Sequence, residues 1–304
     1  MAFKDSLESL WAASSVHYDN ALQFLKSLAA DQNSTAITTE NTTLLESQIG
    51  GSNLPELSTM PFAIDLQMIL SLLFVAVLLI GAYVYTNRVL PASDHERRFR
   101  LLFFWHLIDA LVHFSMEGSF LYHCFFSYAA ISPSQNREPV FLGDKDHVYG
   151  ATYSSWPTAL LWQEYAKADH RWGGADANII SIELITVLFG GTAAATICYW
   201  IYHVSTGRSR KEYVAETKGK LWFTMIALAT AELYGGVMTF MPEFLTGNPS
   251  FSGNWFYVVV YLAFFNLVWV FIPGWVLYEA WKECKAVFAR HGKESSSSRK
   301  MTGK

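Results

Sequence analysis

Five long apolar stretches follow one another along the chain, separated by polar segments. They cover residues 64–85, 101–126, 179–203, 221–245 and 255–281. Each has the roughly 20 residues that a helix needs to cross the hydrocarbon core of a bilayer. The pattern therefore predicts an all-α integral membrane protein with five transmembrane helices.

The second stretch carries ionisable residues inside its apolar run. Asp109, His113 and Glu117 are spaced four apart, so a helix presents all three on one face. Such groups cost a few kcal/mol at membrane depth, and they usually face the protein interior. By itself this stripe fits either a structural hydrogen-bonded seam between helices or a functional site.

Polar groups also interrupt three of the other stretches. The third holds Glu183 and Thr186, three apart; the fourth holds Glu232 close to Tyr234; the fifth holds Asn266 and Trp269, again three apart. Because so many helices place polar groups at membrane depth, we expect them to enclose a polar-lined intramembrane cavity that binds or transforms a ligand.

The basic residues indicate the orientation of the chain. They gather in the first and third loops and in the tail, at Arg88, Arg97, Arg98, Arg100, Arg208, Arg210, Lys211, Lys218, Lys220, Lys282, Lys285, Arg290, Lys293, Arg299 and Lys300. By the positive-inside rule these segments are cytoplasmic. The N-terminus and the second and fourth loops are then lumenal, and the C-terminus is cytoplasmic.

The sequence divides into three parts. Residues 1–60 form a lumenal extension that is either an amphipathic surface helix or loosely ordered, with glycosylation sequons at Asn33 and Asn41. Residues 61–284 form the five-helix membrane domain, and 285–304 are predicted to be a disordered cytoplasmic tail. In the long second loop, residues 159–169 predict a short interfacial helix with Trp162 and Tyr165 at headgroup level.

Composition excludes several classes of function. Hydrophobic residues make up 52% of the 304 residues and charged residues 16%, below the roughly 25% usual for soluble domains. The net charge of −4 and the absence of a basic tract argue against a nucleic-acid partner. Cys124, Cys198 and Cys284 lie in or at the ends of separate helices, without the spacing of a zinc site or a disulfide framework. We therefore expect no metal.

Several motifs, taken in order, resemble the emopamil-binding protein family. They are His113-x-x-x-Glu117-Gly118, Trp162-x-Glu164-Tyr165-Ala166-Lys167-x-Asp169, Glu183-x-x-Thr186, Tyr234-Gly235, and Asn266-x-x-Trp269 followed by Pro273-Gly274. The resemblance covers about residues 101–282. One departure is Gly236, where animal isomerases of the family have an acidic residue after Tyr-Gly; Glu232 supplies an acid one turn earlier.

The resemblance implies a sterol Δ8–Δ7 isomerase of the endoplasmic reticulum membrane, with a five-helix fold and a sterol-sized cavity open toward the bilayer. The partners it implies are a sterol substrate, the lipid bilayer and hydrophobic amine inhibitors. It implies no cofactor. It identifies His113, Glu117 and Glu183 as catalytic, and Thr186, Asn266 and Trp269 as substrate-binding, to which we add Glu232 and Tyr234. A homodimer is left open by the sequence.

The chemistry of a double-bond shift explains these residue types. It requires an acid, a base and a group that stabilises a transient carbocation. His113 with Glu117 is expected to handle one proton and Glu183 the other, while the order of the two steps is not readable from the sequence. Trp269 offers a π face to the cation, and Asn266 and Thr186 orient carboxylates by hydrogen bonds.

Plainer roles are open for the same residues. Trp269 can be a packing residue, Thr186 can bond back to its own helix, and Asn266 can join two helices. The whole chain can also be a non-catalytic relative that binds sterols or cationic amphiphiles, because fold does not fix function. The presence of the full set His113, Glu117, Glu183, Asn266 and Trp269 favours the enzyme, because a binder needs only one or two acids to hold an amine. A proton-coupled transporter is disfavoured, because no repeat is evident.

Overall fold

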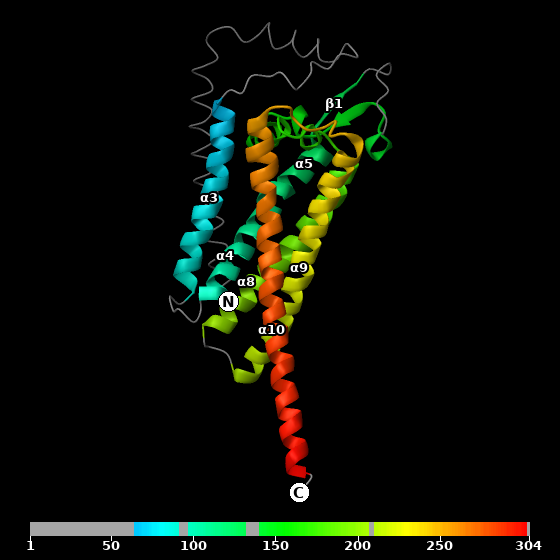
Figure 1. Cartoon of the computed structure of the whole chain (residues 1–304). Helices are drawn as coiled ribbons and strands as arrows, with labels where there is room; N and C mark the ends of the chain where they lie inside the picture. The colour runs from blue at the N-terminus through cyan, green and yellow to red at the C-terminus, as the bar shows by residue number, and fades with distance from the viewer. Residues whose placement is uncertain (1–63, 91–96, 132–139, 207–209, 303–304) are drawn as a thin grey trace. The chain divides into compact units, whose positions relative to one another are not determined.

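A computed structural model describes residues 64–90, 97–131, 140–206 and 210–302. Among these residues, five helices are long and apolar enough to cross a membrane: Leu66–Val89, Arg97–Phe126, Ala177–Ser205, Glu212–Thr246 and Tyr257–Arg290. The predicted all-α membrane class and its five spans are therefore confirmed (Figure 1). The predicted N-terminal extension and both sequons lie outside the described residues.

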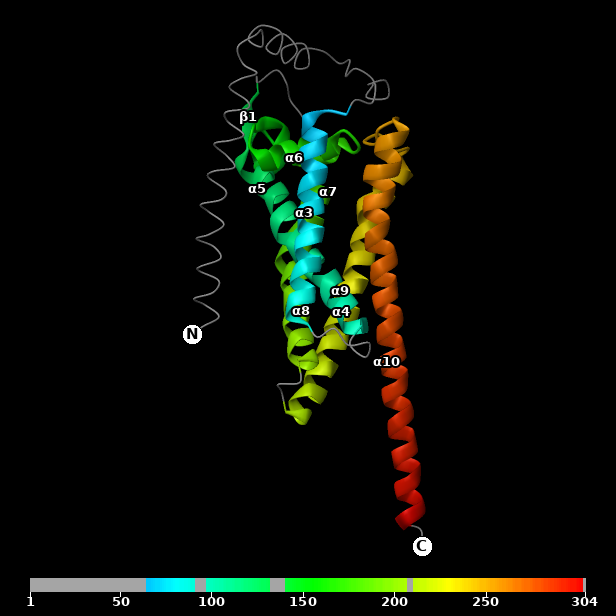
Figure 2. The same ribbon diagram turned by 90° about the vertical axis from the view of Figure 1, so that its left-hand side faces the viewer.

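The first span is α3 (Leu66–Val89), which begins where the side chain of Asp65 accepts a hydrogen bond from the Met68 amide. Within it only Met68, Ala82 and Thr86 are buried. The other side chains are partly or fully exposed and mostly apolar, as expected for a helix that faces lipid. In Figure 2 α3 stands in front of α4, which it contacts.

The second and third spans are each interrupted by a π-helical turn. The second runs through α4 (Arg97–Leu111), η3 (Val112–Glu117) and α5 (Gly118–Phe126). The third runs through α7 (Ala177–Ile185), η7 (Thr186–Gly190) and α8 (Gly191–Ser205). The two π turns contact one another. Because π turns are rare and cluster at functional sites, the place where these two π turns meet is a candidate functional site.

The fourth and fifth spans run side by side (Figures 1 and 2). They are α9 (Lys211–Thr246) and the continuous pair η8 (Tyr257–Phe264) and α10 (Phe265–Thr302). α9 stops at Gly247, whose φ of 86° lies in the left-handed region that favours glycine. α10 continues to Thr302, so the segment predicted to be a disordered tail from residue 285 is helical through 302. Between Gly274 and Gly292 no glycine or proline interrupts it.

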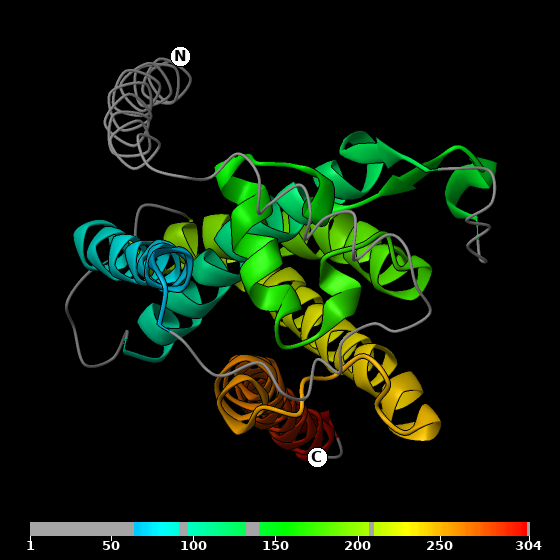
Figure 3. The ribbon, with the colours of Figure 1, turned by 90° about the horizontal axis from the view of Figure 1, so that it is seen from above.

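The described residues of the loop between the second and third spans, 127–131 and 140–176, lie across the ends of the helices (Figure 3). It contains the antiparallel pair β1 (Tyr128–Ala130) and β2 (His147–Tyr149), the short turns η4 (Phe141–Gly143), η5 (Ala151–Tyr153) and η6 (His170–Trp172), and α6 (Pro157–Ala166). Gly150 has a φ of 136°, and a Cβ there would lie 2.5 Å from the Gly173 carbonyl oxygen. Only glycine fits this position.

The predicted short helix at 159–169 is observed as α6, but one of its aromatic side chains was assigned the wrong environment. Trp162 is buried and lies parallel to Trp172, with ring centroids 5.1 Å apart, and its indole N–H donates to Ser119. Tyr165 is partly buried and contacts both tryptophans. Trp162 therefore belongs to the core of the loop rather than to a lipid-facing belt.

Two ion-pair clusters attach this loop to the spans. Glu164, fully buried, lies 2.6 Å from Lys167, which lies 2.8 Å from Asp65 at the start of α3. Burial favours a lower pKa for Lys167, but the hydrogen bonds from its ammonium to Asp65 and Glu164 raise that pKa overall. Arg171 pairs with Asp169 at 2.6 Å and donates to the Thr239 carbonyl of α9. The loop thus holds the first and fourth spans together.

Candidate active site

His113 is the centre of the site. It lies in η3, only 2% of its side chain is exposed, and each ring nitrogen faces a carboxyl group. Nδ1 is 2.5 Å from Oε2 of Glu117, and Nε2 is 3.1 Å from Oδ1 of Asp109. The single polar face predicted from the spacing of these three residues is thus present, and it points into the protein.

Thr186 joins this face to the third span. Its hydroxyl oxygen lies 2.9 Å from Oε2 of Glu117 and 3.0 Å from Oε2 of Glu183. It also lies 3.2 Å from the Glu183 carbonyl oxygen, so the predicted bond back to its own helix coexists with the contacts to the two carboxyls. The three residues predicted to be catalytic, His113, Glu117 and Glu183, are therefore brought into one chain of contacts through Thr186.

The hydrogen count at Thr186 constrains the protons of the site. A hydroxyl has one hydrogen to donate, and an ionised carboxylate or a carbonyl has none. Thr186 has three acceptor oxygens within 3.2 Å and donates to one of them. If its contacts to Glu117 and Glu183 are both hydrogen bonds, at least one of these carboxyl groups is protonated. The geometry is therefore that of an acid beside a base.

Glycines allow the two π turns to approach so closely. A Cβ added at Gly190 would lie 3.2 Å from Nε2 of His113. At Gly191 it would lie 2.9 Å from the Phe114 ring and 3.1 Å from Cβ of His113. All three distances are tighter than ordinary van der Waals contact, so the absence of side chains at the two glycines lets the third span lie against His113.

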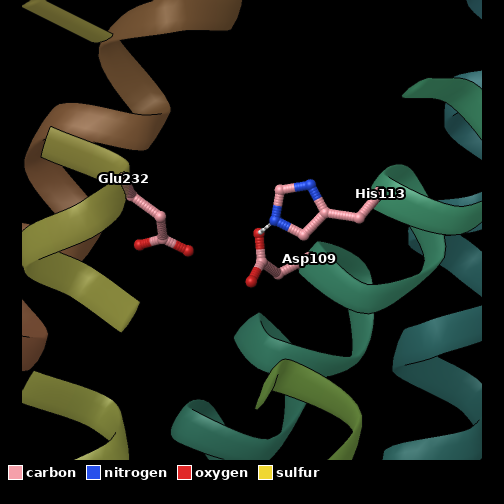
Figure 4. Close-up of side chains that lie close together, drawn as sticks. All are labelled: Asp109, His113 and Glu232. Atoms are coloured by element: carbon pink, nitrogen blue, oxygen red, sulfur yellow. Dashed lines mark ion pairs between the residues drawn. The ribbon is translucent and has the colours of Figure 1, made fainter. Parts of the chain in front are cut away.

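The other side of His113 faces Asp109 and two further spans. The indole N–H of Trp269 on α10 donates to Oδ1 of Asp109 at 3.2 Å. Glu232 on α9 points its carboxyl group toward Asp109 and His113 (Figure 4). One ligand-type atom from each of Asp109, His113 and Glu232 lies within 4.8 Å of the others. These three side chains are therefore the set in the described part of the chain that has the geometry to hold a cation.

Asp109 is the site residue that the sequence-based assignment omitted. It is completely buried and contacts both His113 and Trp269. Its spacing of four from His113 was the available signal, but the family motifs gave it no role. The pairing also explains Trp269, whose N–H is turned to a carboxylate while its ring packs against Trp105 at 5.4 Å.

Two predicted binding residues lie apart from this cluster. Asn266 donates to the Tyr165 hydroxyl at 2.9 Å and to the Leu262 carbonyl at 2.8 Å. It therefore joins the fifth span to the loop and contacts none of the site carboxylates. Tyr234 is 66% exposed on the outer face of α9. The prediction that Asn266 and Tyr234 bind substrate gains no support from these positions and stays a prediction.

Two pockets lie near the loop. One, of about 240 Å³, is lined by Tyr122, Phe126, Ser127, Tyr128, Tyr153, Ser154 and Trp156. The other, of about 190 Å³, lies around β2 and Phe141. Neither is lined by the residues around His113. The polar-lined intramembrane cavity therefore stays a prediction.

The fold and the site define a class: a membrane protein of five spans with a buried cluster of carboxyl groups and one histidine. The second, third and fourth spans supply these groups, and the fifth adds the indole N–H of Trp269. Residues 157–280 match the family model described as EBP: EXPERA (EXPanded EBP superfamily). The resemblance to the emopamil-binding protein family predicted from the motifs is therefore confirmed. The match includes Glu183, Thr186, Glu232 and Trp269, and it begins after the second span.

Curated relatives extend the similarity beyond that segment. The chain is 26% identical over 251 residues to the probable 3-beta-hydroxysteroid-Delta(8),Delta(7)-isomerase of Arabidopsis thaliana, covering 82% of this chain and 94% of that protein. A match of this length necessarily includes His113 and Glu117. The isomerase of the same name from Cavia porcellus is 26% identical over 60% of this chain and 65% of its own length. The isomeliandiol synthase of Ailanthus altissima is 21% identical over 65% of this chain and 76% of its own length.

Proposed function

We propose that this chain is a sterol isomerase that moves a ring double bond from the Δ8 to the Δ7 position. Relatives named as 3-beta-hydroxysteroid-Delta(8),Delta(7)-isomerases support the reaction. The observation that carries the proposal is the continuous series Glu183, Thr186, Glu117 and His113, with contacts of 2.5–3.0 Å, at membrane depth. A sterol resides in the bilayer and reaches such a site from there.

The reaction needs one proton in and one proton out. A proton added to ring carbon nine consumes the Δ8 double bond and leaves a tertiary cation at carbon eight. Loss of a proton from carbon seven then forms the Δ7 double bond. No electrons are gained or lost overall, so an acid and a base are sufficient.

Glu183 is the proposed acid. Glu117 is already close to a ring nitrogen of His113, which is a donor when it carries hydrogen, and to the Thr186 hydroxyl. A carboxyl that accepts from both is most stable ionised, and Glu183 then supplies the remaining hydrogen to Thr186. In this assignment Glu183 protonates carbon nine, and the His113–Glu117 pair accepts the proton from carbon seven.

Thr186 provides the return path. After the reaction the proton resides on the His113–Glu117 pair, and Glu183 is ionised. A proton passed from Glu117 to Oγ1 of Thr186, with the Thr186 hydrogen passed on to Glu183, restores the starting state. The distances of 2.9 and 3.0 Å suit both transfers.

The transient carbocation is stabilised by nearby carboxyl groups that no Lys or Arg side chain neutralises. In the described part of the chain no Lys or Arg forms an ion pair with Asp109, Glu117, Glu183 or Glu232. The excess of carboxyl groups favours a transient positive charge. The π face of Trp269 is proposed to add about 2 kcal/mol if it is desolvated against that charge.

The location proposed for this activity is the endoplasmic reticulum membrane, with the N-terminus lumenal and the C-terminus cytoplasmic. The ends of the spans that carry Arg97, Arg98, Lys218, Lys220 and Lys282 are on the same side by alternation. This placement follows the positive-inside rule.

The test is isomerisation in deuterated water. Membranes containing the protein are incubated with a Δ8 sterol, and product is followed by mass spectrometry and NMR. The expected product has a Δ7 bond and deuterium at carbon nine, and it disappears with Glu183→Gln. Intact binding of a sterol or an amphiphilic amine without any conversion would reject the enzyme in favour of the non-catalytic relative.

A further inference from the structure

Three buried polar atoms at the Asp109 side of the site have no hydrogen-bond partner. They are Oδ2 of Asp109, Oε1 of Glu232 and Nε2 of His113; the last lies 3.1 Å from Oδ1 of Asp109 as an ion-pair contact, without the alignment of a hydrogen bond. The exposed fractions of these residues are 0%, 8% and 2%. The side chains converge from α4, α9 and η3 (Figure 4). A buried carboxylate oxygen without a donor is costly, so something must supply hydrogen bonds here.

The surroundings of Asp109 mark it as the ionised member of the group. Its Oδ1 accepts the Trp269 indole N–H at 3.2 Å and lies 3.1 Å from Nε2 of His113. The indole N–H is always a donor, and Nε2 of His113 is a donor when it carries hydrogen. Both neighbours stabilise the ionised form of the Asp109 carboxyl. The other oxygen, Oδ2, has no donor from the protein in the described residues.

Glu232 is in the opposite situation. It lies beside Asp109, its Oε1 has no donor, and no described Lys or Arg pairs with it. Two ionised carboxylates this close in an apolar interior repel strongly, as in the shared-proton carboxyl pairs of acid proteases. One proton placed between them removes the repulsion and gives the unpartnered oxygen of Asp109 a donor.

We propose that Glu232 is a neutral carboxylic acid that donates its hydroxyl hydrogen to Asp109, and that this Glu232–Asp109 pair is a positioning device for His113. The ionised Asp109 holds the Nε2–H of the imidazole, so Nδ1 is aimed at Glu117 on the opposite edge of the ring. The expected effect on turnover rests on the proposed function. The protonation of Glu232 is independent of that function.

A consequence is that the two carboxyl pairs are organised in the same way. Glu183 and Glu232 are the neutral members, while Glu117 and Asp109 are the ionised ones, and His113 lies between the latter two. The imidazole can then be protonated with a carboxylate at each nitrogen, which offsets the cost of charge at membrane depth.

The direct test is infrared spectroscopy of the protein in lipid nanodiscs. The difference between wild type and Glu232→Gln is expected to contain the C=O stretch of one protonated carboxylic acid, shifted in deuterated water. A difference that contains the bands of an ionised carboxylate instead would overturn the proposal. This measurement needs no sterol and no turnover, so it stands even if the isomerase proposal fails.

The activity test compares two substitutions at one position. Glu232→Gln keeps an N–H that can donate to Asp109, whereas Glu232→Ala leaves Oδ2 of Asp109 without a donor. We expect Glu232→Ala to lower kcat about tenfold or more. The kcat of Glu232→Gln should be at least about threefold higher than that of Glu232→Ala, with KM little changed in both variants. Equal loss in the two variants would contradict the proposal.

Two controls complete the design. Glu216→Gln, on the same helix and exposed beside Lys220 at 2.7 Å, is expected to match wild type in both measurements. Metal analysis of the purified wild-type protein tests the other occupant of this cluster. One equivalent of a divalent cation that is lost in Glu232→Ala would show that a metal, and not a proton, joins the carboxyl groups, and it would overturn the proposal.

Discussion

The Thr186 hydroxyl lies 2.9 Å from Oε2 of Glu117, which joins the third span to the second at the crossing of two π turns. The same oxygen is 3.0 Å from Glu183. This single side chain therefore connects the proposed acid with the proposed base, and it is the most direct point at which to test the mechanism.

Replacing Thr186 by Val removes the hydroxyl and keeps the shape. We expect kcat to fall about tenfold or more, equivalent to about 1.4 kcal/mol, because the proton returns to Glu183 without its relay. Thr186→Ser keeps the hydroxyl and should lose much less. Steady-state kinetics with a Δ8 sterol measures both. Similar losses in Val and Ser would assign Thr186 a packing role.

Glu183→Gln removes the acid while preserving a similar volume and hydrogen bonding. The expected loss in turnover is about 10²–10⁴-fold, the usual contribution of a positioned general acid. Sterol binding should change little, because an amide still contacts Thr186. Glu216→Gln serves as the matched control, since that side chain is exposed near the start of a different helix, α9. If Glu183→Gln kept its activity, a group other than Glu183 would have to donate the proton to carbon nine.

Hydrophobic amines are expected to bind at the site, because an ammonium group resembles the carbocation and pairs with the same carboxylates. Replacing both Glu117 and Glu183 by Gln should weaken binding about thirtyfold or more, the loss of hydrogen bonds to charged groups. The matched control is a neutral ligand of the same shape, whose affinity should hardly change. Amine affinity that is independent of both residues would place the ligand elsewhere.

Gly190→Ala tests the close approach of the third span. The new methyl group would lie 3.2 Å from Nε2 of His113, so the ring has to move away. We expect a destabilisation of about 1–3 kcal/mol and a loss of activity, because overpacking displaces the imidazole. Gly219→Ala on α9, with nothing within 4 Å, is the control and should be neutral or slightly stabilising. Thermal unfolding in nanodiscs and turnover are the measurements.

Lys167→Met tests the loop attachment. Glu164 is fully buried, and the substitution leaves its charge without the cation. The expected loss of unfolding free energy is about 1–3 kcal/mol, less than for a fully buried pair because Lys167 is one-third exposed. Lys220→Met, which breaks an exposed pair, should hardly change the free energy of unfolding. If the two variants unfold alike, the loop is held by its aromatic core instead.

The spans and the polar face of the second helix followed directly from the sequence. Apolar length identified all five spans, and the observed ends differ from the predicted ones by up to nine residues. The spacing of Asp109, His113 and Glu117 placed them on one face, because side chains four apart on a helix are neighbours whatever surrounds the helix. Both features depend only on the order of residues along one helix, so the sequence is sufficient to predict them.

What only the tertiary structure decided is how the helices are turned toward one another. In the folded protein Glu232 lies beside Asp109, and the Trp269 indole N–H donates to the same carboxylate. Tyr234 faces outward, and Asn266 donates to Tyr165 of the loop. Helical spacing sets which residues share a face but not which face meets which partner. That rotation depends on packing between spans, on glycines such as Gly190 and Gly191, and on π turns that shift the phase of each helix within the membrane.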